Sequence, residues 1–173
     1  HKVDEAYEST DETGATTMQT ISFDYRFNNL CNFKCRMCGD MLSSSWEAES
    51  RKHNRWSKES QPWMASPLRE QIIKFQDTYW CGGEPLMWDM HWKAMQRIIE
   101  LGFAKEVYIR YNTNLSRTSF KGTKLFELLP EFGDWQICSS LDGTGEVGEY
   151  IRDGLNYEQW LRNFKEGMAV AKT

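Results

Sequence analysis

The feature that most constrains the fold of this chain is a regular alternation between strand-like and helix-like segments. Residues 21–27 alternate apolar and polar side chains, and residues 78–81, 107–111 and 135–141 are further short β-type segments. Helices are expected between and after them, at 39–52, 68–75, 89–101, 120–129 and 157–168. Such an order implies a parallel sheet with right-handed crossovers. The sequence therefore predicts an α/β fold, a partial parallel (β/α) barrel of about four strand–helix units.

Individual residues indicate where these helices begin and end. Asp89 and Asn156 are expected to be N-caps, Pro67 to lie in the first turn of its helix, and Pro130 to end the helix before it. In the last helix, four side chains at helical spacing are expected to form one face, namely Tyr157, Leu161, Phe164 and Met168.

Length and composition indicate one domain with a polar N-terminal arm. The chain has 173 residues, of which 40% are hydrophobic, and this is enough to bury a sizeable core. It has no run of 18 apolar residues, so no membrane-spanning helix is expected. Residues 1–20 are polar and acidic, and we expect them to form an arm with little structure of its own. Residues 21–173 would then form the partial barrel.

The charge balance argues against a surface that binds nucleic acid over its whole extent. There are 21 Lys and Arg against 25 Asp and Glu, which gives a net charge of -4. One local stretch, residues 51–58, combines basic side chains with Trp56 and would suit contact with RNA or an acidic peptide. The simpler interpretation is a solvated helix end. We therefore expect neither a nucleic-acid partner nor a membrane.

Three of the five cysteines, Cys31, Cys35 and Cys38, fall within eight residues in the spacing CxxxCxxC. Thiolates are soft ligands that suit zinc or iron–sulfur clusters. A closed zinc site needs four ligands, usually as two separated pairs, whereas three thiolates on one loop suit three corners of a 4Fe–4S cluster. A zinc site and inert thiols are the alternatives. Cys81 and Cys138 are expected to be small buried residues of strands.

The other unusual residues also follow predicted strands. Gly82-Gly83-Glu84-Pro85 comes after the second strand, where a glycine pair lets the backbone approach a ligand and Glu84 adds a carboxylate. Asn112-Thr113-Asn114 follows the third strand, and Ser140-Leu141-Asp142-Gly143 follows the fourth. Function in parallel α/β folds gathers at the carboxyl ends of strands, so we expect one site there.

Together, CxxxCxxC after the first strand and Gly-Gly-Glu-Pro after the second resemble the radical S-adenosylmethionine (radical SAM) superfamily. The endings of the third and fourth strands also resemble it, and the resemblance runs from about residue 21 to the last helix. The chain is most similar to members whose barrel is followed by a twitch or SPASM domain, including phage and marine proteins. A full family barrel, (β/α)6, has about six units. We therefore expect this chain to be the N-terminal part of a longer protein.

The resemblance implies a 4Fe–4S cluster on Cys31, Cys35 and Cys38, with S-adenosylmethionine on its fourth iron. Gly82, Gly83 and Glu84 are the implied partners of the methionine amino group. Met37 stands where the family commonly has an aromatic residue, and its thioether is expected to pack against the adenine. The implied cofactor-binding residues are, in full, Gly82, Gly83, Glu84, Pro85, Asn112, Thr113, Asn114, Ser140, Asp142, Arg152 and Met37.

The implied reaction is reductive cleavage of S-adenosylmethionine to a 5′-deoxyadenosyl radical that takes hydrogen from a substrate. A peptide or protein side chain is the expected substrate, and a reductant such as flavodoxin or ferredoxin is the expected partner. Because oxygen damages such a site, a reducing cytoplasm is the expected compartment. The alternatives are an activase of a glycyl-radical enzyme and a non-catalytic zinc-binding module. No catalytic side chain beyond the cofactor site is assignable.

Overall fold

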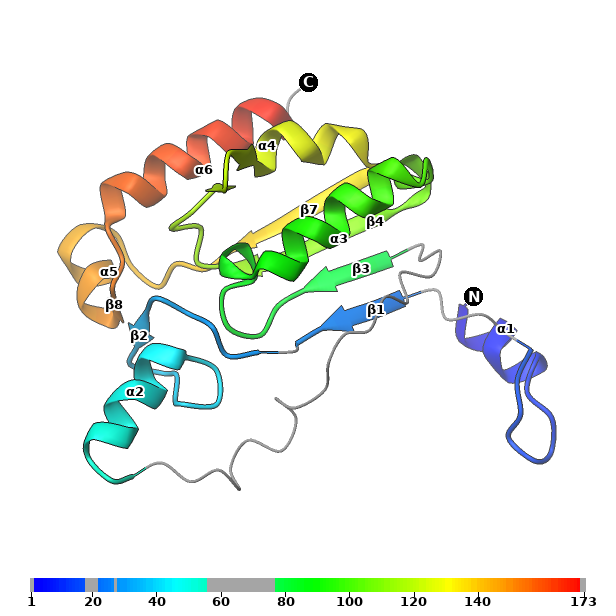
Figure 1. The fold of residues 1–173 in the computed structure, drawn as a ribbon, viewed down its shortest axis with the longest axis horizontal. Helices are drawn as coiled ribbons and strands as arrows, with labels where there is room; N and C mark the ends of the chain where they lie inside the picture. Colours follow the sequence, from blue (N-terminus) through cyan, green and yellow to red (C-terminus); the bar gives the residue numbers. More distant parts are fainter. Residues whose placement is uncertain (1, 18–21, 27, 56–76, 172–173) are drawn as a thin grey trace.

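The centre of the molecule is a four-stranded parallel sheet. The computed structural model describes residues 2–17, 22–26, 28–55 and 77–171 (Figure 1). Strands β1 (Ser22–Tyr25), β3 (Asp77–Trp80), β4 (Tyr108–Thr113) and β7 (Asp134–Ser139) lie side by side in that order, and each pair is parallel. The parallel α/β arrangement is therefore confirmed. Closure of this sheet into a barrel stays a prediction.

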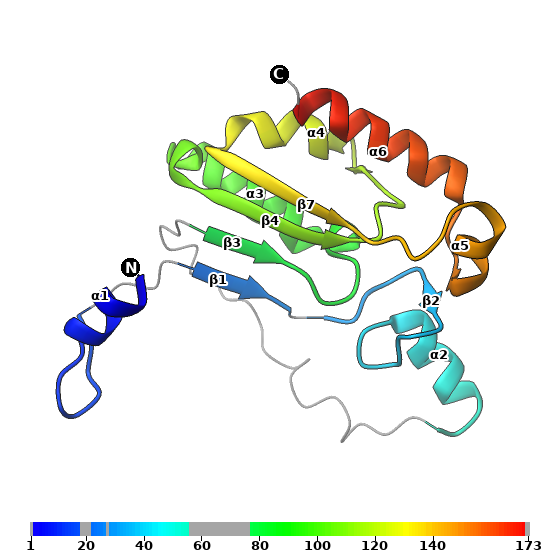
Figure 2. The ribbon, with the colours of Figure 1, turned by 180° about the vertical axis from the view of Figure 1, so that it is seen from behind.

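Helices cover one face of the sheet. Helix α3 (Asp89–Glu100) lies in front of the strands in Figure 1, with α4 (Leu125–Leu128) and α6 (Tyr157–Ala171) beyond β7. Seen from behind in Figure 2, the strands lie in front of α3 and no described helix crosses them. Helices α2 (Ser44–Lys52) and α5 (Gly145–Ile151) lie beyond the carboxyl ends of the strands.

The face that carries α3 is apolar. Tyr25, Trp80 and Tyr111 share one register row across three strands, and each is at most 3% exposed. Tyr25 stacks on Trp80 with ring centroids 4.1 Å apart. His91 of α3 is fully buried against this row, with its Nε2 2.7 Å from the hydroxyl of Tyr111. Burial lowers the pKa of His91 to about 3, so this side chain is a neutral packing residue.

The opposite face is polar because side chains alternate along a strand. Arg110 forms an ion pair with Asp77 at 3.0 Å, and Arg26 forms one with Asp24 at 2.9 Å. The thiol of Cys81, just after β3, donates to Asp24 Oδ1 at 3.0 Å. One register row on this face runs across all four strands, namely Asp24, Tyr79, Arg110 and Gln136.

Helix α3 is bounded as its sequence suggests, with one correction. It ends next to Gly102, whose φ of +80° is a conformation that favours glycine. Its N-cap residue is Trp88 rather than Asp89. The Asp89 carboxylate instead pairs with Lys93 at 2.6 Å and with Lys121 at 2.8 Å. Asp89 therefore serves as an acidic first-turn residue.

The helix expected at residues 120–129 is wrong in its first half. This part is a hairpin of β5 (Ser119–Phe120) and β6 (Thr123–Lys124), and only α4 and the 3-10 helix η4 (Leu129–Glu131) are helical. Lys121 and Gly122 have φ values of 48° and 86°, so both central residues of the turn are left-handed, as a two-residue hairpin requires. Pro130 was expected to end the helix before it, but it lies inside η4, so the helical turns continue through it.

One prediction about the first and last elements was wrong and one is confirmed. The expected arm contains helix α1 (Lys2–Glu8) and a turn closed by a bridge between Thr10 and Thr16. Helix α6 is capped as predicted, because Asn156 Oδ1 accepts from the backbone N of Gln159 at 2.8 Å.

The expected apolar face of α6 is only partly buried. Trp160, which is not one of the four expected side chains, is 6% exposed. Of those four, Tyr157 and Leu161 are partly buried against the core, whereas Phe164 and Met168 are 38% and 42% exposed. The latter two line a groove of about 250 Å³ beside β7. The apolar side chains at this spacing therefore do not all turn toward the core.

The two cysteines outside the CxxxCxxC spacing are not buried as expected. Cys138 is exposed and Cys81 is only half-buried, because both lie on the polar face of the sheet, so the prediction that they are buried was wrong.

The helix predicted at 68–75, with Pro67, lies outside the described residues. So do residues 56–58 of the basic stretch, whose residues 51–55 are exposed at the end of α2.

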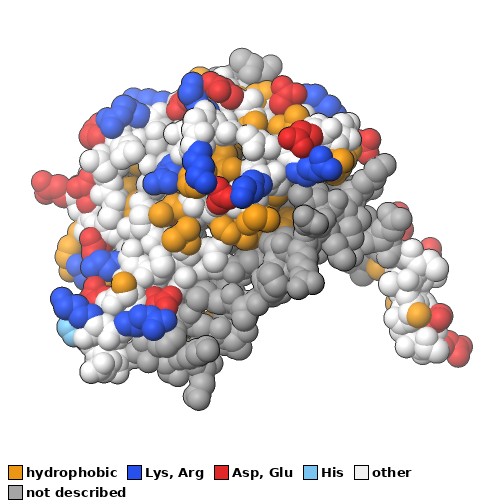
Figure 3. Space-filling model, in the orientation of Figure 1, with side chains coloured by type: hydrophobic (Ala, Val, Ile, Leu, Met, Phe, Trp, Pro, Cys, Tyr) orange, Lys and Arg blue, Asp and Glu red, His pale blue; other side chains and the backbone are white. Residues whose placement is uncertain are grey.

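Charges of both signs are mixed over the surface that carries α3 and α4 (Figure 3). Ion pairs account for much of this mixture, as at Arg97–Glu100 and Lys124–Glu127. This surface therefore has no large field of one sign. Among the described residues, no helix has the length and apolar character needed to cross a membrane. Four short elements complete the described fold: the 3-10 helices η2 (Pro85–Met87) and η3 (Ala104–Glu106), and the paired strands β2 (Lys34–Cys35) and β8 (Arg152–Asp153).

The hydrogen bond between His91 and Tyr111 gives a test of the core. Tyr111→Phe would leave a buried imidazole nitrogen without its partner, so we expect the free energy of unfolding to fall by about 1–3 kcal/mol. Tyr108→Phe is the matched control, because the Tyr108 hydroxyl donates to Gln136 at an exposed position. Urea unfolding should show a change below about 0.5 kcal/mol for this control. Equal losses in the two variants would contradict the assignment.

Candidate functional site

A cavity lies at the carboxyl ends of the parallel strands, where the sequence predicts a site. Its volume is about 170 Å³. All three clustered cysteines line it, together with residues from the ends of β3, β4 and β7 and from β8. These lining residues are Cys31, Phe33, Cys35, Cys38, Leu42, Ser43, Gly82, Gly83, Asn112, Thr113, Asn114, Ser140 and Arg152. Segments far apart in the sequence therefore meet around the three thiols.

The start of helix α2 fixes the cysteine loop. Ser44 Oγ accepts from the backbone N of Cys31 at 3.1 Å, and the Ser45 hydroxyl donates to the Cys31 carbonyl at 2.9 Å. The indole N–H of Trp46 donates to the Cys35 carbonyl at 2.9 Å. The Ser-Ser-Ser-Trp sequence at the start of this helix thus positions the backbone that carries two of the thiols.

Polar N–H groups point at two of the sulfurs. Arg152 lies opposite Cys35 in the β2–β8 pair, and its Nη1 is 3.6 Å from Cys35 Sγ. Asn114 Nδ2 is 3.8 Å from Cys31 Sγ. Asp142 lies 2.6 Å from the Arg152 guanidinium and orients it. Such N–H···S contacts stabilise negative charge on sulfur and tune bound metal clusters.

The thiols of Cys31 and Cys35 are protonated at neutral pH in the chain alone. Burial raises the pKa of Cys31 to about 11, and burial also raises the pKa of Cys35. A metal ion inverts this preference, because a coordinating thiol loses its proton. Loading of a metal on this loop would therefore release protons and depend on pH.

The glycine turn after β3 packs directly on the cysteine loop. The backbone N of Gly83 donates to Asn28 O at 3.2 Å, and that of Glu84 donates to Leu30 O at 2.6 Å. A Cβ atom on Gly83 would lie 2.5 Å from the Leu30 oxygen, which no side chain tolerates. Gly82 has a φ of +105°. The two glycines are therefore needed for this close backbone approach.

Glu84 lies behind the cavity wall and does not line it. Its carboxylate is 2% exposed and accepts three hydrogen bonds, from the Thr113 hydroxyl at 2.7 Å, Asn114 N at 2.7 Å and Leu86 N at 3.0 Å. Desolvation raises the pKa of Glu84 to about 7, even though these donors favour the charged form. The structure thus gives Glu84 a positioning role between the turn and the end of β4.

The structure brings together most of the predicted site residues. Gly82, Gly83, Asn112, Thr113, Asn114, Ser140 and Arg152 line the cavity with the three cysteines. Glu84 and Pro85 are buried outside the lining, and Asp142 reaches the site only through Arg152. Met37 is 57% exposed and is not part of the lining, so its expected packing on an adenine stays a prediction.

Sequence reasoning missed three lining residues, Phe33, Leu42 and Ser43. Phe33 is 1% exposed and forms part of the core between the first two cysteines. An aromatic residue inside a metal-binding spacing is a signal that could have identified it. Ser43 is the N-cap of α2, and its hydroxyl also donates to the Phe33 carbonyl. Leu42 gives no sequence signal of its own.

Within the described residues, no group of three or more His, Cys, Asp and Glu side chains is close enough to hold one metal ion. A cubic cluster separates its thiolate ligands more widely, because each binds a different iron. The cavity, at about 170 Å³, is smaller than the roughly 300–1,000 Å³ of small-molecule sites.

Comparison of this chain with protein-family models, with curated proteins and with solved structures finds no match.

Glu84 is expected to make stability depend on pH. Its pKa is raised from 4.5 to about 7, so the folded chain holds a proton that the unfolded chain releases. That stabilisation is complete below the unfolded pKa and is lost as the pH rises through the folded pKa. Relative to Glu84→Gln, which does not titrate, the wild-type free energy of unfolding should fall by about 2–3 kcal/mol from pH 5 to pH 8. Parallel pH profiles in urea unfolding would contradict this.

The close approach of the two loops is tested at its glycine. Gly83→Ala forces backbone atoms apart, and we expect the free energy of unfolding to fall by about 1–3 kcal/mol. Gly39→Ala is the matched control in the same loop region, because nothing lies within 4 Å of a Cβ placed there. Equal midpoints of thermal unfolding for the two variants would show that the turn has room for a side chain.

Proposed function

We propose that this chain binds a 4Fe–4S cluster through Cys31, Cys35 and Cys38 and binds S-adenosylmethionine beside it, as radical SAM enzymes do. The observation that carries the proposal is the shared cavity, in which three thiols from one loop meet the glycine turn and the polar end of β4. Three thiolates leave one iron for the amino and carboxylate groups of the second cofactor. When bound, this pair supplies one-electron cleavage to a 5′-deoxyadenosyl radical that takes hydrogen from a substrate.

The residues around the cavity have distinct roles in this proposal. Arg152 and Asn114 orient two of the sulfurs through their N–H groups and favour the thiolate form. Asp142 acts through Arg152, and Glu84 holds the turn against the end of β4. Gly82 and Gly83 bring no side chain into the cavity, so a ligand can lie close to their main chain.

Two polar residues complete this set. Asn112 and Ser140 line the cavity on neighbouring strand ends, and their side chains offer hydrogen bonds to ribose hydroxyls or a carboxylate. Asn112 lies on the same side of β4 as Arg110, on the polar sheet face. The described helices leave this face of the sheet uncovered (Figure 2). We propose that a peptide or protein substrate approaches over this face. The proposed electron donor is a flavodoxin or ferredoxin in a reducing cytoplasm.

Anaerobic reconstitution with iron and sulfide tests the proposal. The chain should turn brown, absorb light at about 400 nm, hold roughly four iron atoms and cleave S-adenosylmethionine after reduction. Alanine at Cys31, Cys35 or Cys38 should abolish the absorption and the cleavage, because a thiolate ligand is lost. Alanine at Cys81 or Cys138 is the matched control and should leave both intact.

Different failures have different meanings. A colourless chain with one bound zinc would overturn the proposal in favour of a zinc-binding module. Iron binding that survives loss of any one of the clustered cysteines would exclude them as the ligands. A cluster without cleavage of S-adenosylmethionine would contradict the proposed reaction and leave the cluster site intact.

A further inference from the structure

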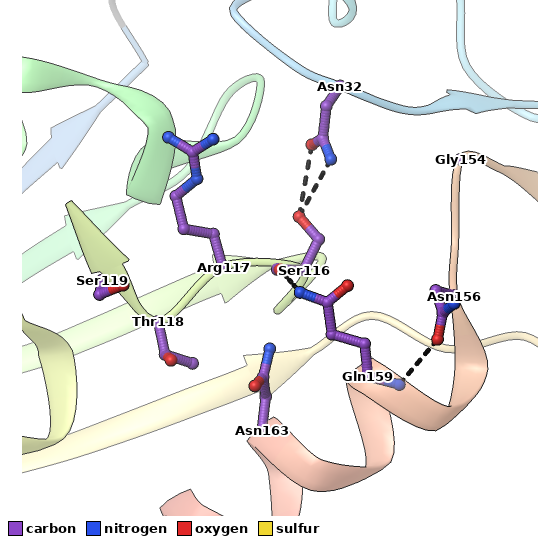
Figure 4. Close-up of a pocket in the computed structure, with 9 residues that line it drawn as sticks. All are labelled: Asn32, Ser116, Arg117, Thr118, Ser119, Gly154, Asn156, Gln159 and Asn163. Atoms are coloured by element: carbon purple, nitrogen blue, oxygen red, sulfur yellow. Dashed lines mark hydrogen bonds between the residues drawn. The ribbon is translucent and has the colours of Figure 1, made fainter.

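A second, larger pocket lies beside the cysteine cavity. Its volume is about 550 Å³, within the range of small-molecule sites. The segment between β4 and β5 forms one wall, the start of α6 forms the other, and Asn32 reaches in from the cysteine loop (Figure 4). The lining residues are Asn32, Ser116, Arg117, Thr118, Ser119, Gly154, Asn156, Gln159 and Asn163.

The lining of this pocket is polar throughout. Four amide side chains, three hydroxyls and one guanidinium surround the space, and none of the lining residues is acidic, aromatic or aliphatic. Amides and hydroxyls both donate and accept hydrogen bonds, so they match a ligand rich in hydroxyl groups. An apolar or aromatic ligand would gain little in such a pocket.

Arg117 gives the pocket its charge. Its side chain is exposed, and none of the described carboxylates forms an ion pair with it. Its described aromatic contact is a weak one, with the guanidinium carbon 6.0 Å from the Phe120 ring centroid. A guanidinium with free N–H groups beside hydroxyls is suited to a phosphate or carboxylate group.

Several of the amides are already fixed in place. Ser116 is the centre of a small network, because Asn32 Nδ2 donates to its hydroxyl at 3.1 Å and Gln159 Nε2 donates to its carbonyl at 3.0 Å (Figure 4). Asn163 Nδ2 donates to the Leu115 carbonyl at 2.8 Å. These bonds use the amide N–H groups and leave amide oxygens of Gln159 and Asn163 to accept from ligand hydroxyls. The pocket is therefore preorganised.

The backbone N–H groups at the N-terminal end of helix α6 are not the groups that would bind a ligand in this pocket. The backbone N of Tyr157 already donates to Glu149 Oε1 at 2.8 Å, and that of Gln159 donates to Asn156 Oδ1. The first amides of the helix are thus engaged within the chain, and the side chains must supply the contacts to a ligand.

We propose that this pocket binds a small sugar phosphate. The phosphate would lie at Arg117, and the sugar hydroxyls would meet the hydroxyls of Thr118 and Ser119 and the amides of Gln159 and Asn163. This inference is independent of the cluster proposed above and does not require it. Asn32 nevertheless touches both sites, because its Oδ1 accepts from Asn114 Nδ2 at 3.1 Å and Asn114 also contacts Cys31. A ligand here would border the cysteine loop.

Calorimetric titration of the whole chain with ribose 5-phosphate, ribose, inorganic phosphate and AMP tests the proposal. Ribose 5-phosphate should bind at least about tenfold more tightly than ribose, since a charge-assisted contact is lost with the phosphate. It should also bind more tightly than inorganic phosphate. AMP should not exceed it, because no aromatic residue lines the pocket for a base. AMP binding more than tenfold tighter would overturn the sugar-phosphate assignment, as would equal binding of ribose and ribose 5-phosphate.

Variants locate the binding. Arg117→Gln should weaken ribose 5-phosphate binding by at least about tenfold, and Thr118→Val by about threefold or more. Arg162→Gln removes the same charge from the exposed side of α6 outside the lining, so it is the matched control and should bind as the wild type does. Amide chemical shifts should move at 116–119 and 156–163. Unchanged affinity in Arg117→Gln with an unchanged unfolding midpoint would overturn the proposal.

Discussion

Glu84 connects the three segments on which the cysteine cavity depends. Its backbone N–H donates to the cysteine loop at Leu30, while its carboxylate accepts from the end of β4 and from its own 3-10 turn. A buried carboxylate is costly unless donors surround it, so this position is stable only when all three segments are in place. The shape of the cavity is therefore tied to one side chain that does not line it.

The sheet separates packing from chemistry. One face holds the aromatic row and α3, and it supplies most of the buried apolar surface. The other face carries ion pairs and the two cysteines that lie outside the CxxxCxxC spacing, Cys81 and Cys138. Because side chains alternate along each strand, residues at the carboxyl ends can reach the cavity while their neighbours anchor the sheet. Thr113 and Asn112 show this, since one bonds Glu84 and the other is exposed toward the cavity.

Two cavities share a border at Asn32. This residue directly follows Cys31 and contacts Asn114 on one side and Ser116 on the other. A displacement of the cysteine loop would therefore displace residues of the polar pocket, and a ligand bound in that pocket would restrain the loop. The coupling would be carried by hydrogen bonds between three short polar side chains, whose geometry tolerates little displacement.

Much of the fold followed from local patterns, and its errors have physical causes. Period-two alternation predicted the strands at 21–27 and 107–111, because a strand with one buried face must alternate, and the strand at 78–81 was predicted from its β-rich composition. The hairpin at 119–124 was missed, since Lys121 in a left-handed conformation has no strong sequence signal. Cys81 and Cys138 were expected to be buried because the sequence does not show which face of a sheet helices will cover. The N-cap of α3 is Trp88 rather than the expected Asp89, whose carboxylate instead pairs with Lys93 and Lys121.

The sequence alone determined the order of the elements, the parallel sheet and the grouping of polar residues at the strand ends. These follow from short-range periodicity and from the handedness of crossovers. Only the tertiary structure decided which of those residues share a cavity, that Glu84 lies behind its wall, and that Arg152 faces Cys35. These depend on contacts between residues up to 117 positions apart, and no local pattern encodes such distances. The polar pocket around Ser116 likewise exists only once β4, α6 and the cysteine loop have come together.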